Sequence, residues 1–184
     1  MFFIALYISI INISNAQEGD TIYWSSKAKL KWSDFNFGIP DTCSKYGAAA
    51  MTASYIERKS FVSGKLPNYN IKVYFIKSES CAKDTSLLIK ISHEQLHFDI
   101  TELFARKMRR AVERLRDENI SNINVYKSSL TKLSVDANSY QDKYDLETSH
   151  GNRDSFQIQW EEKVKKELKE LKAYSSDNKQ KKQK

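Results

Sequence analysis

The chain has 184 residues, of which 40% are hydrophobic and 12% aromatic, a size and composition that suit one domain with its own core. The formal net charge of +7 would suit a nucleic-acid partner, but the residues beyond Tyr174 carry four lysines, one aspartate and no apolar side chain. We therefore expect no nucleic-acid binding and interpret residues 175–184 as a disordered basic tail.

The first residues have the composition of a secretory signal peptide. Residues 2–13 are nearly all apolar, and Ser14 and Ala16 place small side chains at the two positions that define a cleavage site. About twelve apolar residues are too few to span a bilayer, which needs about 20. We predict a signal peptide over residues 1–16, export to the periplasm or the extracellular space, and no stable membrane span after cleavage. A retained anchor and a buried first strand are the alternatives.

Export would place the chain in an oxidising compartment, where its two cysteines, Cys43 and Cys81, could pair. Such a bridge would close a long loop and stabilise the fold by about 3–4 kcal/mol. Two free, buried thiols are the alternative, and neither cysteine has the spacing of a zinc or redox motif.

Short strands and a loop are predicted after the signal peptide. Residues 21–24 and 29–32 are interpreted as strands, the second because polar and apolar side chains alternate in it. Residues 36–40 predict a loop, since Gly38 and Pro40 interrupt regular structure.

A β-hairpin is predicted next. Residues 69–76 alternate apolar with polar or amphipathic side chains, as a half-buried strand does. Residues 48–61 mix alanines, which favour helix, with residues that favour strand; we interpret them as a strand because Gly64 and Pro67 then make the turn into a clear partner. The N-terminal half is therefore expected to form a small, mainly antiparallel sheet.

The second half of the chain is predicted to be helical. Apolar residues recur at spacings of three, four and seven through residues 84–117, which indicates one long helix with Asp84 as its N-cap. A second stripe begins at Ile123 and predicts a helix that ends near Glu147, with Gly151 as the stop signal.

A third apolar stripe runs from Phe156 to Leu171, and Asn152 or Asp154 could cap its helix. There is no internal repeat and no sign of a second domain. The predicted fold class is α+β: one domain over residues 17–174, with a small, mainly antiparallel sheet packed on about three helices.

The most informative motif is His93-Glu94-Gln95-Leu96-His97, on the first long helix. Residues four apart leave the same face of a helix, about 6 Å apart along its axis, so both imidazoles can reach one Zn²⁺. Glu94 stands about 100° round the helix and can flank the metal without ligating it, where it could take a proton from zinc-bound water. A helix with two incidental histidines is the alternative.

A catalytic zinc site needs three protein ligands and an open position. His150 is the expected third ligand, because Gly151 beside it frees the end of the second helix to turn back toward the metal. Glu147, which continues the apolar stripe of that helix, is the rival, and Asp145 is a weaker third choice.

Other polar residues near the motif have less direct interpretations. Tyr144 could place its phenol near an oxyanion at the zinc, although a tyrosine in a helical stripe more often belongs to the core. Asp99 and Glu102 point away from the metal, and Asp99 is expected to hold a hydrogen-bond or ion-pair partner elsewhere. A basic cluster after them is interpreted as a solvated face: Arg106, Lys107, Arg109 and Arg110.

Four groups of residues together resemble a known family: residues 30–35 with Gly38 and Pro40; the metal motif extended through Phe98, Asp99 and Ile100; Glu102, Ala105, Arg106, Lys107 and Arg109; and Tyr144, Asp145, Thr148, His150 and Gly151. The resemblance is to predicted secreted zinc-dependent proteases of bacteria and covers most of the chain after the signal peptide. It implies a zincin-like metallopeptidase with Zn²⁺ as its cofactor and with His150 where a third ligand is expected.

These observations predict an exported zinc metallohydrolase, most plausibly a peptidase acting on a peptide or protein. In this mechanism His93, His97 and His150 hold Zn²⁺, and Glu94 passes a proton from water to the leaving amine. The alternative is a non-catalytic envelope protein that binds zinc in a closed structural site or sequesters it.

Overall fold

A computed structural model describes residues 19–37, 43, 50–83 and 88–177. Several predictions lie wholly or partly outside the described residues: the signal peptide over residues 1–16, loop residues 38–40, the first two residues of the strand predicted over residues 48–61, the start of the helix predicted over residues 84–117 with its cap at Asp84, and tail residues 178–184.

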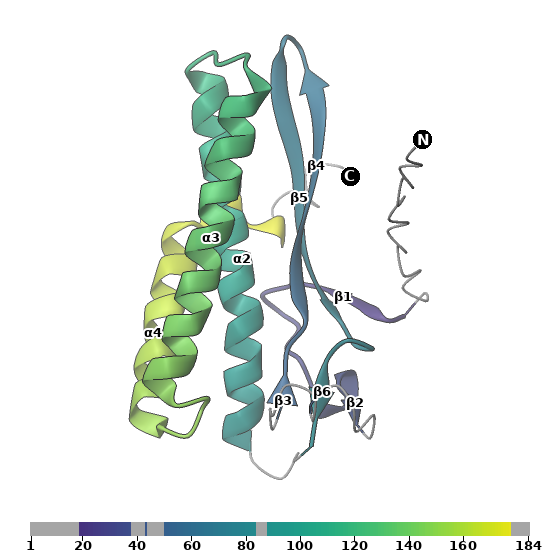
Figure 1. The fold of residues 1–184 in the computed structure, drawn as a ribbon, viewed down its shortest axis with the longest axis vertical. Coiled ribbons are helices and arrows are strands. Elements are labelled where there is room, and N and C mark those ends of the chain that lie inside the picture. Colours follow the sequence, from purple (N-terminus) through teal and green to yellow (C-terminus); the bar gives the residue numbers. More distant parts are fainter. Residues whose placement is uncertain (1–18, 38–42, 44–49, 84–87, 178–184) are drawn as a thin grey trace, which may run out of the picture.

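The chain folds into a strand layer packed against a layer of helices (Figure 1), which confirms the predicted α+β class. The strands are β1 (Thr21–Tyr23), β2 (Asn36–Phe37), β3 (Ala50–Met51), β4 (Ser54–Ser63), β5 (Leu66–Ile76) and β6 (Cys81–Ala82). The helices are α2 (Leu88–Asp117), α3 (Ile123–Thr148) and α4 (Asp154–Glu170), with short 3₁₀ turns η1 (Trp32–Asp34) and η2 (Lys172–Tyr174).

The main sheet has the strand order β1-β5-β4, and both of its pairings are antiparallel. Its centre is the predicted hairpin, which turns at Gly64, where a φ of 67° suits glycine. A smaller sheet has the order β2-β6-β3, in which β6 is parallel to β2 and antiparallel to β3.

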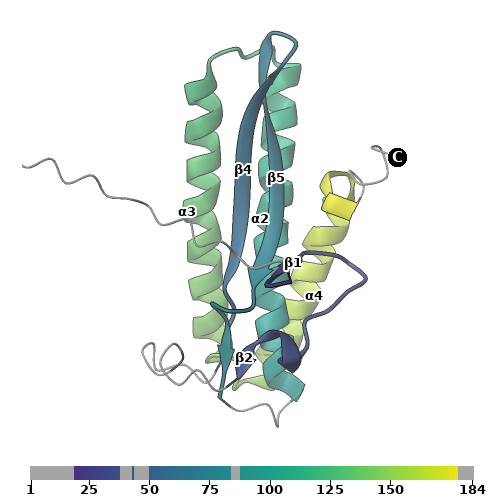
Figure 2. The ribbon, with the colours of Figure 1, turned by 90° about the vertical axis from the view of Figure 1, so that its right-hand side faces the viewer.

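Helix α2, which carries the His93–His97 motif, is buried on two sides by two hydrophobic cores. One core joins it to the sheet, where Phe98, Met108 and Val112 pack with strand residues such as Val73 and Phe75. A second core joins it to the other two helices through Leu96, Ile100, Phe104, Tyr144, Trp160 and Val164. Figure 2 shows α2 behind the β4–β5 hairpin, with α3 and α4 on opposite sides of it.

The helix bounds agree with the predicted periodicity, whereas two strand predictions need correction. Residues 29–32 form no strand: the Leu30 amide donates to Gln95 Oε1 at 2.8 Å, and Trp32 begins η1. The strand predicted over residues 48–61 is divided into β3 and β4. Between them, the Ala53 amide donates to Ser80 Oγ instead of to a neighbouring strand.

Smaller details of the predicted bounds also differ. Asn36 and Phe37, expected in a loop, form β2, and Pro67 lies inside β5 rather than in the turn. The cap of α4 is Arg153, whose side chain makes no capping hydrogen bond, and Asp154 lies in the first turn.

Two members of the predicted basic cluster, Arg106 and Arg109, are not solvated but buried with Glu102, whereas Arg110 is exposed as expected. Glu102 Oε1 accepts from Arg106 Nε at 2.9 Å and from Arg109 Nη1 at 3.0 Å. Both arginines also donate to the C-terminal segment, Arg106 to Ser175 Oγ at 2.9 Å and Arg109 to the Tyr174 carbonyl at 2.9 Å. Ser175 is therefore buried and ordered, so a disordered tail cannot begin there as predicted.

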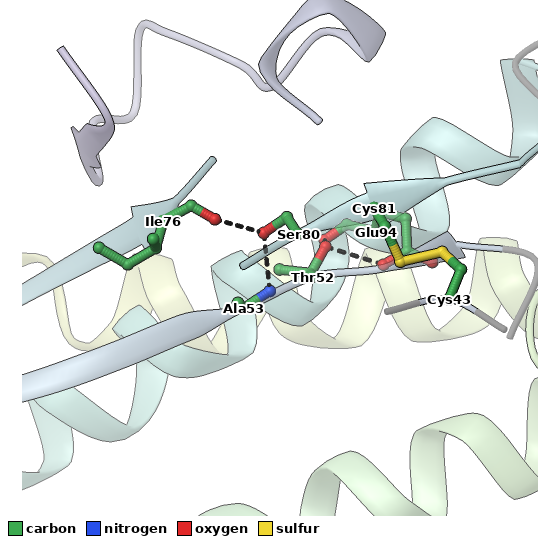
Figure 3. Close-up of a disulfide and its surroundings, with 7 residues drawn as sticks. All are labelled: Cys43, Thr52, Ala53, Ile76, Ser80, Cys81 and Glu94. Atoms are coloured by element: carbon green, nitrogen blue, oxygen red, sulfur yellow. Dashed lines mark hydrogen bonds between the residues drawn. A yellow bond between two sulfur atoms is a disulfide. The ribbon is translucent and has the colours of Figure 1, made fainter. Parts of the chain in front are cut away.

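Cys43 and Cys81 form a disulfide, one of the two outcomes that the sequence left open. Figure 3 shows the disulfide beside two hydrogen bonds. In one the Ala53 amide donates to Ser80 Oγ, and in the other the Thr52 hydroxyl donates to the Glu94 carboxylate. None of the described helices is long and apolar enough to cross a membrane.

The buried ionic cluster predicts a large mutational effect on stability. Glu102→Ala should lower the free energy of unfolding by about 3–5 kcal/mol, because it leaves two buried guanidinium groups without their anion. Glu113→Ala, an exposed glutamate on the same helix, should change it by less than about 0.5 kcal/mol. Urea denaturation of the two variants tests this, and equal midpoints would contradict the assigned role of Glu102.

Candidate metal centre

Two histidines of α2 and one aspartate of α3 bring three ligand atoms together. His93 Nε2 and His97 Nε2 are 3.2 Å apart, as their spacing of four on the helix predicts. Asp145 Oδ1 lies 3.2 Å from the first nitrogen and 3.0 Å from the second. Within the described residues, this is the group whose donor atoms could hold a metal ion.

Two glutamines determine which ring nitrogen of each histidine carries the proton. His97 Nδ1 lies 2.7 Å from Gln141 Oε1, and His93 Nδ1 lies 3.2 Å from Gln157 Oε1. The amides are oriented by their other bonds: Gln141 Nε2 donates to the His97 carbonyl, and Gln157 Nε2 donates to Glu161. Because an amide oxygen only accepts, each Nδ1 is the donor, and each Nε2 presents a lone pair.

The three atoms therefore converge as electron-pair donors. Among the described residues no hydrogen-bond donor is aligned on the buried Asp145 Oδ1. Ligands about 2.0–2.1 Å from a tetrahedral zinc lie about 3.3–3.4 Å from one another, close to the separations of 3.0–3.2 Å in this cluster. The donor set and its spacing thus fit a tetrahedral cation.

The charges around the cluster support the same conclusion. Burial alone would raise the pKa of the Asp145 carboxyl, but His93 and His97 beside it hold that pKa well below its usual range. Burial alone would lower the pKa of His97, but Asp145 and Glu94 outweigh it and raise that pKa. Both pKa shifts describe the cluster with a proton on the imidazole nitrogens that face Asp145, so a positive charge among the three atoms is favoured, and a bound cation would take the place of that proton.

Packing restrains the His93 ring. Tyr144 stacks on it with ring centroids 4.6 Å apart, and the backbone of Gly151 lies close by. A Cβ added at Gly151 would lie 2.9 Å from His93 Cγ, and the φ of 73° at this residue also favours glycine. Helix α3 ends at Thr148 with Ser149 as its C-cap, so Gly151 follows the helix as predicted but does not itself end it; it lets the chain approach the metal motif.

The structure brings Asp145, rather than the predicted third ligand His150, up to the two histidines. His150 has a side chain that is 77% exposed, and its Nδ1 lies 3.7 Å from Asp145 Oδ1, so it stands at the rim rather than in the cluster. Its backbone is left-handed, with a φ of 53°, between Ser149 and Gly151, which are also left-handed. The rival Glu147 accepts from Trp160 Nε1 at 2.8 Å and is directed elsewhere. Asp145, the weakest of the three candidates, occupies the position.

Tyr144 lies in the core beside the cluster and does not line the cleft, so the structure gives no support to its predicted catalytic role. Its side chain is fully buried, and its hydroxyl donates to Gln157 Oε1 at 2.7 Å. It thereby supports the amide that orients His93. Asp99 faces away from the donor cluster, as expected, and its partners are Trp24, Lys29 and Gln95.

Glu94 is buried beside the cluster but is not part of it. Thr52 donates to Glu94 Oε2 at 2.8 Å, and Thr52 follows β3, which pairs with β6 at Cys81. Ser80 next to that cysteine accepts from the Ala53 amide at 3.0 Å. The disulfide and the strand pairing therefore position the residue that holds Glu94, as Figure 3 shows.

The cluster lies in the wall of a cleft of about 850 Å³. Residues 50–58 form one side of it and α3 forms the other, while His93, Glu94, His97 and Asp145 line it together. His150 and Asn152 lie at one end, and Arg58 and Ser134 contribute elsewhere along it. A ligand in the cleft would therefore contact both the donor cluster and Glu94.

Comparison of the chain with protein-family models, with curated proteins and with solved structures finds no match. The resemblance to secreted zinc-dependent proteases, and with it the zincin-like fold, therefore stays a prediction.

The corrected ligand set makes a direct prediction about zinc content. Asp145→Ala should abolish stoichiometric Zn²⁺ binding because it removes one of three ligands, whereas His150→Ala and Glu147→Ala should retain it. Elemental analysis of the dialysed proteins measures this. Loss of zinc from His150→Ala, with Asp145→Ala still loaded, would reverse the assignment.

A second prediction concerns the affinity for Zn²⁺ of a variant that lacks one of the orienting glutamines. Gln141→Ala should weaken Zn²⁺ binding by about 10–100-fold, because His97 then loses the partner that fixes its tautomer and ring orientation. Asn138→Ala, a cleft residue one turn away on α3, is the matched control and should stay within about twofold. Competition with a chromophoric chelator measures both, and equal affinities would exclude the orienting role.

Proposed function

We propose that this protein is an exported zinc-dependent hydrolase that cleaves peptide bonds. The observation that carries the proposal is the convergence of two imidazole nitrogens and one carboxylate oxygen beside Glu94, in the wall of an open cleft.

The donor set supports zinc as the cofactor. Two neutral imidazoles and one carboxylate form a common ligand set of catalytic zinc sites, which keep a further position open for substrate or water. The described residues supply three donors, and the cleft supplies the open side. When bound, zinc would lower the pKa of water in contact with it toward 7 and polarise the carbonyl to be attacked.

In the proposed mechanism, side chains of the protein transfer the proton and hold the reacting groups in position. The Glu94 carboxylate takes one proton from the attacking water, so that the hydroxide forms a bond to the carbonyl carbon. Glu94 then gives the proton to the amide nitrogen as the carbon–nitrogen bond breaks, which leaves a carboxylic acid and an amine. Thr52 holds one Glu94 oxygen in place, and Gln141 and Gln157 keep both imidazoles in the metal-binding tautomer.

The shape of the cleft supports an extended substrate. Its lining runs from Arg58 and Ser134 past the donor cluster to Asn152, between β4 and α3. A stretch of unfolded polypeptide can lie along such a channel with one peptide group beside Glu94.

A closed structural or sequestering site is the competing function, and the geometry favours it less. A structural zinc site is surrounded by four protein ligands, whereas here three described residues converge and the fourth direction faces the cleft. Export is supported by the Cys43–Cys81 disulfide, since such bridges persist in oxidising compartments.

The proposed function is tested by a substitution of Glu94, the proposed general base. Glu94→Gln should lower turnover of an unfolded protein substrate, such as casein, by about 10²–10⁴-fold while zinc stays stoichiometric, because the amide cannot take the proton. Glu113→Gln on the exposed face of α2 carries the same charge change and should keep full activity. Undiminished cleavage by the Glu94 variant would eliminate this mechanism, as would a zinc-loaded wild type without any hydrolase activity.

A further inference from the structure

A second cavity, of about 1430 Å³, lies on the side of α2 opposite the metal cleft. Ser92, Gln95 and Leu96 line this groove, whereas His93, Glu94 and His97 line the cleft, so the same two helical turns serve both. The other walls are α4 and residues 24–30, a segment that bows outward beside α4 in Figure 2.

The groove has an apolar floor. Its side chains come from three separate parts of the chain and are buried or partly buried: Trp24, Leu30, Ile91, Leu96, Val164 and Leu168. An apolar body placed against them would be removed from water over much of its surface.

The opening of the groove carries a net positive charge. Lys27, Lys165 and Lys169 line it with exposed side chains and have no ion pair within the described part of the chain. Asp99 is paired with Lys29, whereas Asp177 and Glu161 accept hydrogen bonds from the neutral Ser26 and Gln157 and keep their negative charge. The basic side chains that line the groove outnumber its three carboxylates, so an incoming anion meets a net positive charge.

The walls are held by contacts within the chain and need no ligand to form. Segment 24–30 is tied at Ser26, whose hydroxyl donates to Asp177 at 2.6 Å, and at Lys29, which pairs with Asp99 at 3.0 Å. The Trp24 ring is fixed by its bond to Asp99 at 2.7 Å and by the Arg106 guanidinium, 5.0 Å from the ring centroid. Most ligand pockets are largely preformed in this way.

We propose that this groove binds an amphipathic anion, a single acyl chain that ends in a carboxylate or phosphate group. The chain lies on the apolar floor, and the anionic head meets Lys165 and Lys169 of α4 at the opening. The proposal does not depend on the hydrolase activity or on the metal, because none of the donor residues of the metal centre lines the groove.

The test is a titration of the purified protein with dodecanoate below its micelle concentration, followed by tryptophan fluorescence, since Trp24 lies in the floor. Saturable one-to-one binding is expected. Lys165→Glu/Lys169→Glu should weaken it by about tenfold or more, because two attractive charges become repulsive. Dodecanol should bind at least about tenfold more weakly than dodecanoate, and acetate should not bind.

Lys127→Glu/Lys166→Glu is the matched control, since it makes the same charge change on α3 and α4 at exposed residues outside the groove and should bind normally. Co-sedimentation with anionic but not zwitterionic phospholipid vesicles would identify the head as that of a membrane lipid; binding of dodecanoate alone would identify a free acid. Equal binding by both double variants, equal binding of dodecanol, or a dimer in solution that covers the groove would overturn the proposal.

Discussion

The candidate site depends on how α2 is packed against α3. Each imidazole of the metal motif has one nitrogen fixed by a glutamine amide, so the other nitrogen is left as a lone pair directed at Asp145. Tyr144 and Gly151 close the space around His93 and prevent the ring from turning away. A rotation of α3 by one residue would remove Gln141 and Asp145 together, since both lie on the face directed at α2.

That packing is supported from outside the site. The sheet buries one side of α2, α4 buries another through Trp160 and Val164, and the Glu102 ionic cluster joins α2 to β5 and to the C-terminal segment. The disulfide adds a separate link, since it lies next to the pairing that holds Thr52 against Glu94. The donor cluster and the proposed base are thus positioned by different parts of the chain.

The periodic parts of the fold could be predicted from the sequence. The three helices carry long apolar stripes, and a spacing of four brings His93 and His97 together in any helix. Asp145 could not be chosen over His150 and Glu147, because that choice depends on the rotation of α3 relative to α2. Gln141 precedes Asp145 by one helical turn, a spacing that could have drawn attention to it.

The burial of Arg106 and Arg109 was missed for a different reason. A run of basic residues is usually solvated; the spacings of four and seven place Glu102 on the same helix face as both arginines, but only tertiary packing buries the three side chains. The alternation over residues 29–32 was too short to separate a strand from an extended segment whose amide bonds a side chain.

The most direct test of the proposed zinc site is zinc-edge anomalous diffraction from crystals of the zinc-loaded protein. We expect one zinc per chain, about 2.0–2.2 Å from His93 Nε2, His97 Nε2 and Asp145 Oδ1, with a position open toward the cleft. A zinc enclosed by four protein donors, or one held by His150 in place of Asp145, would contradict it.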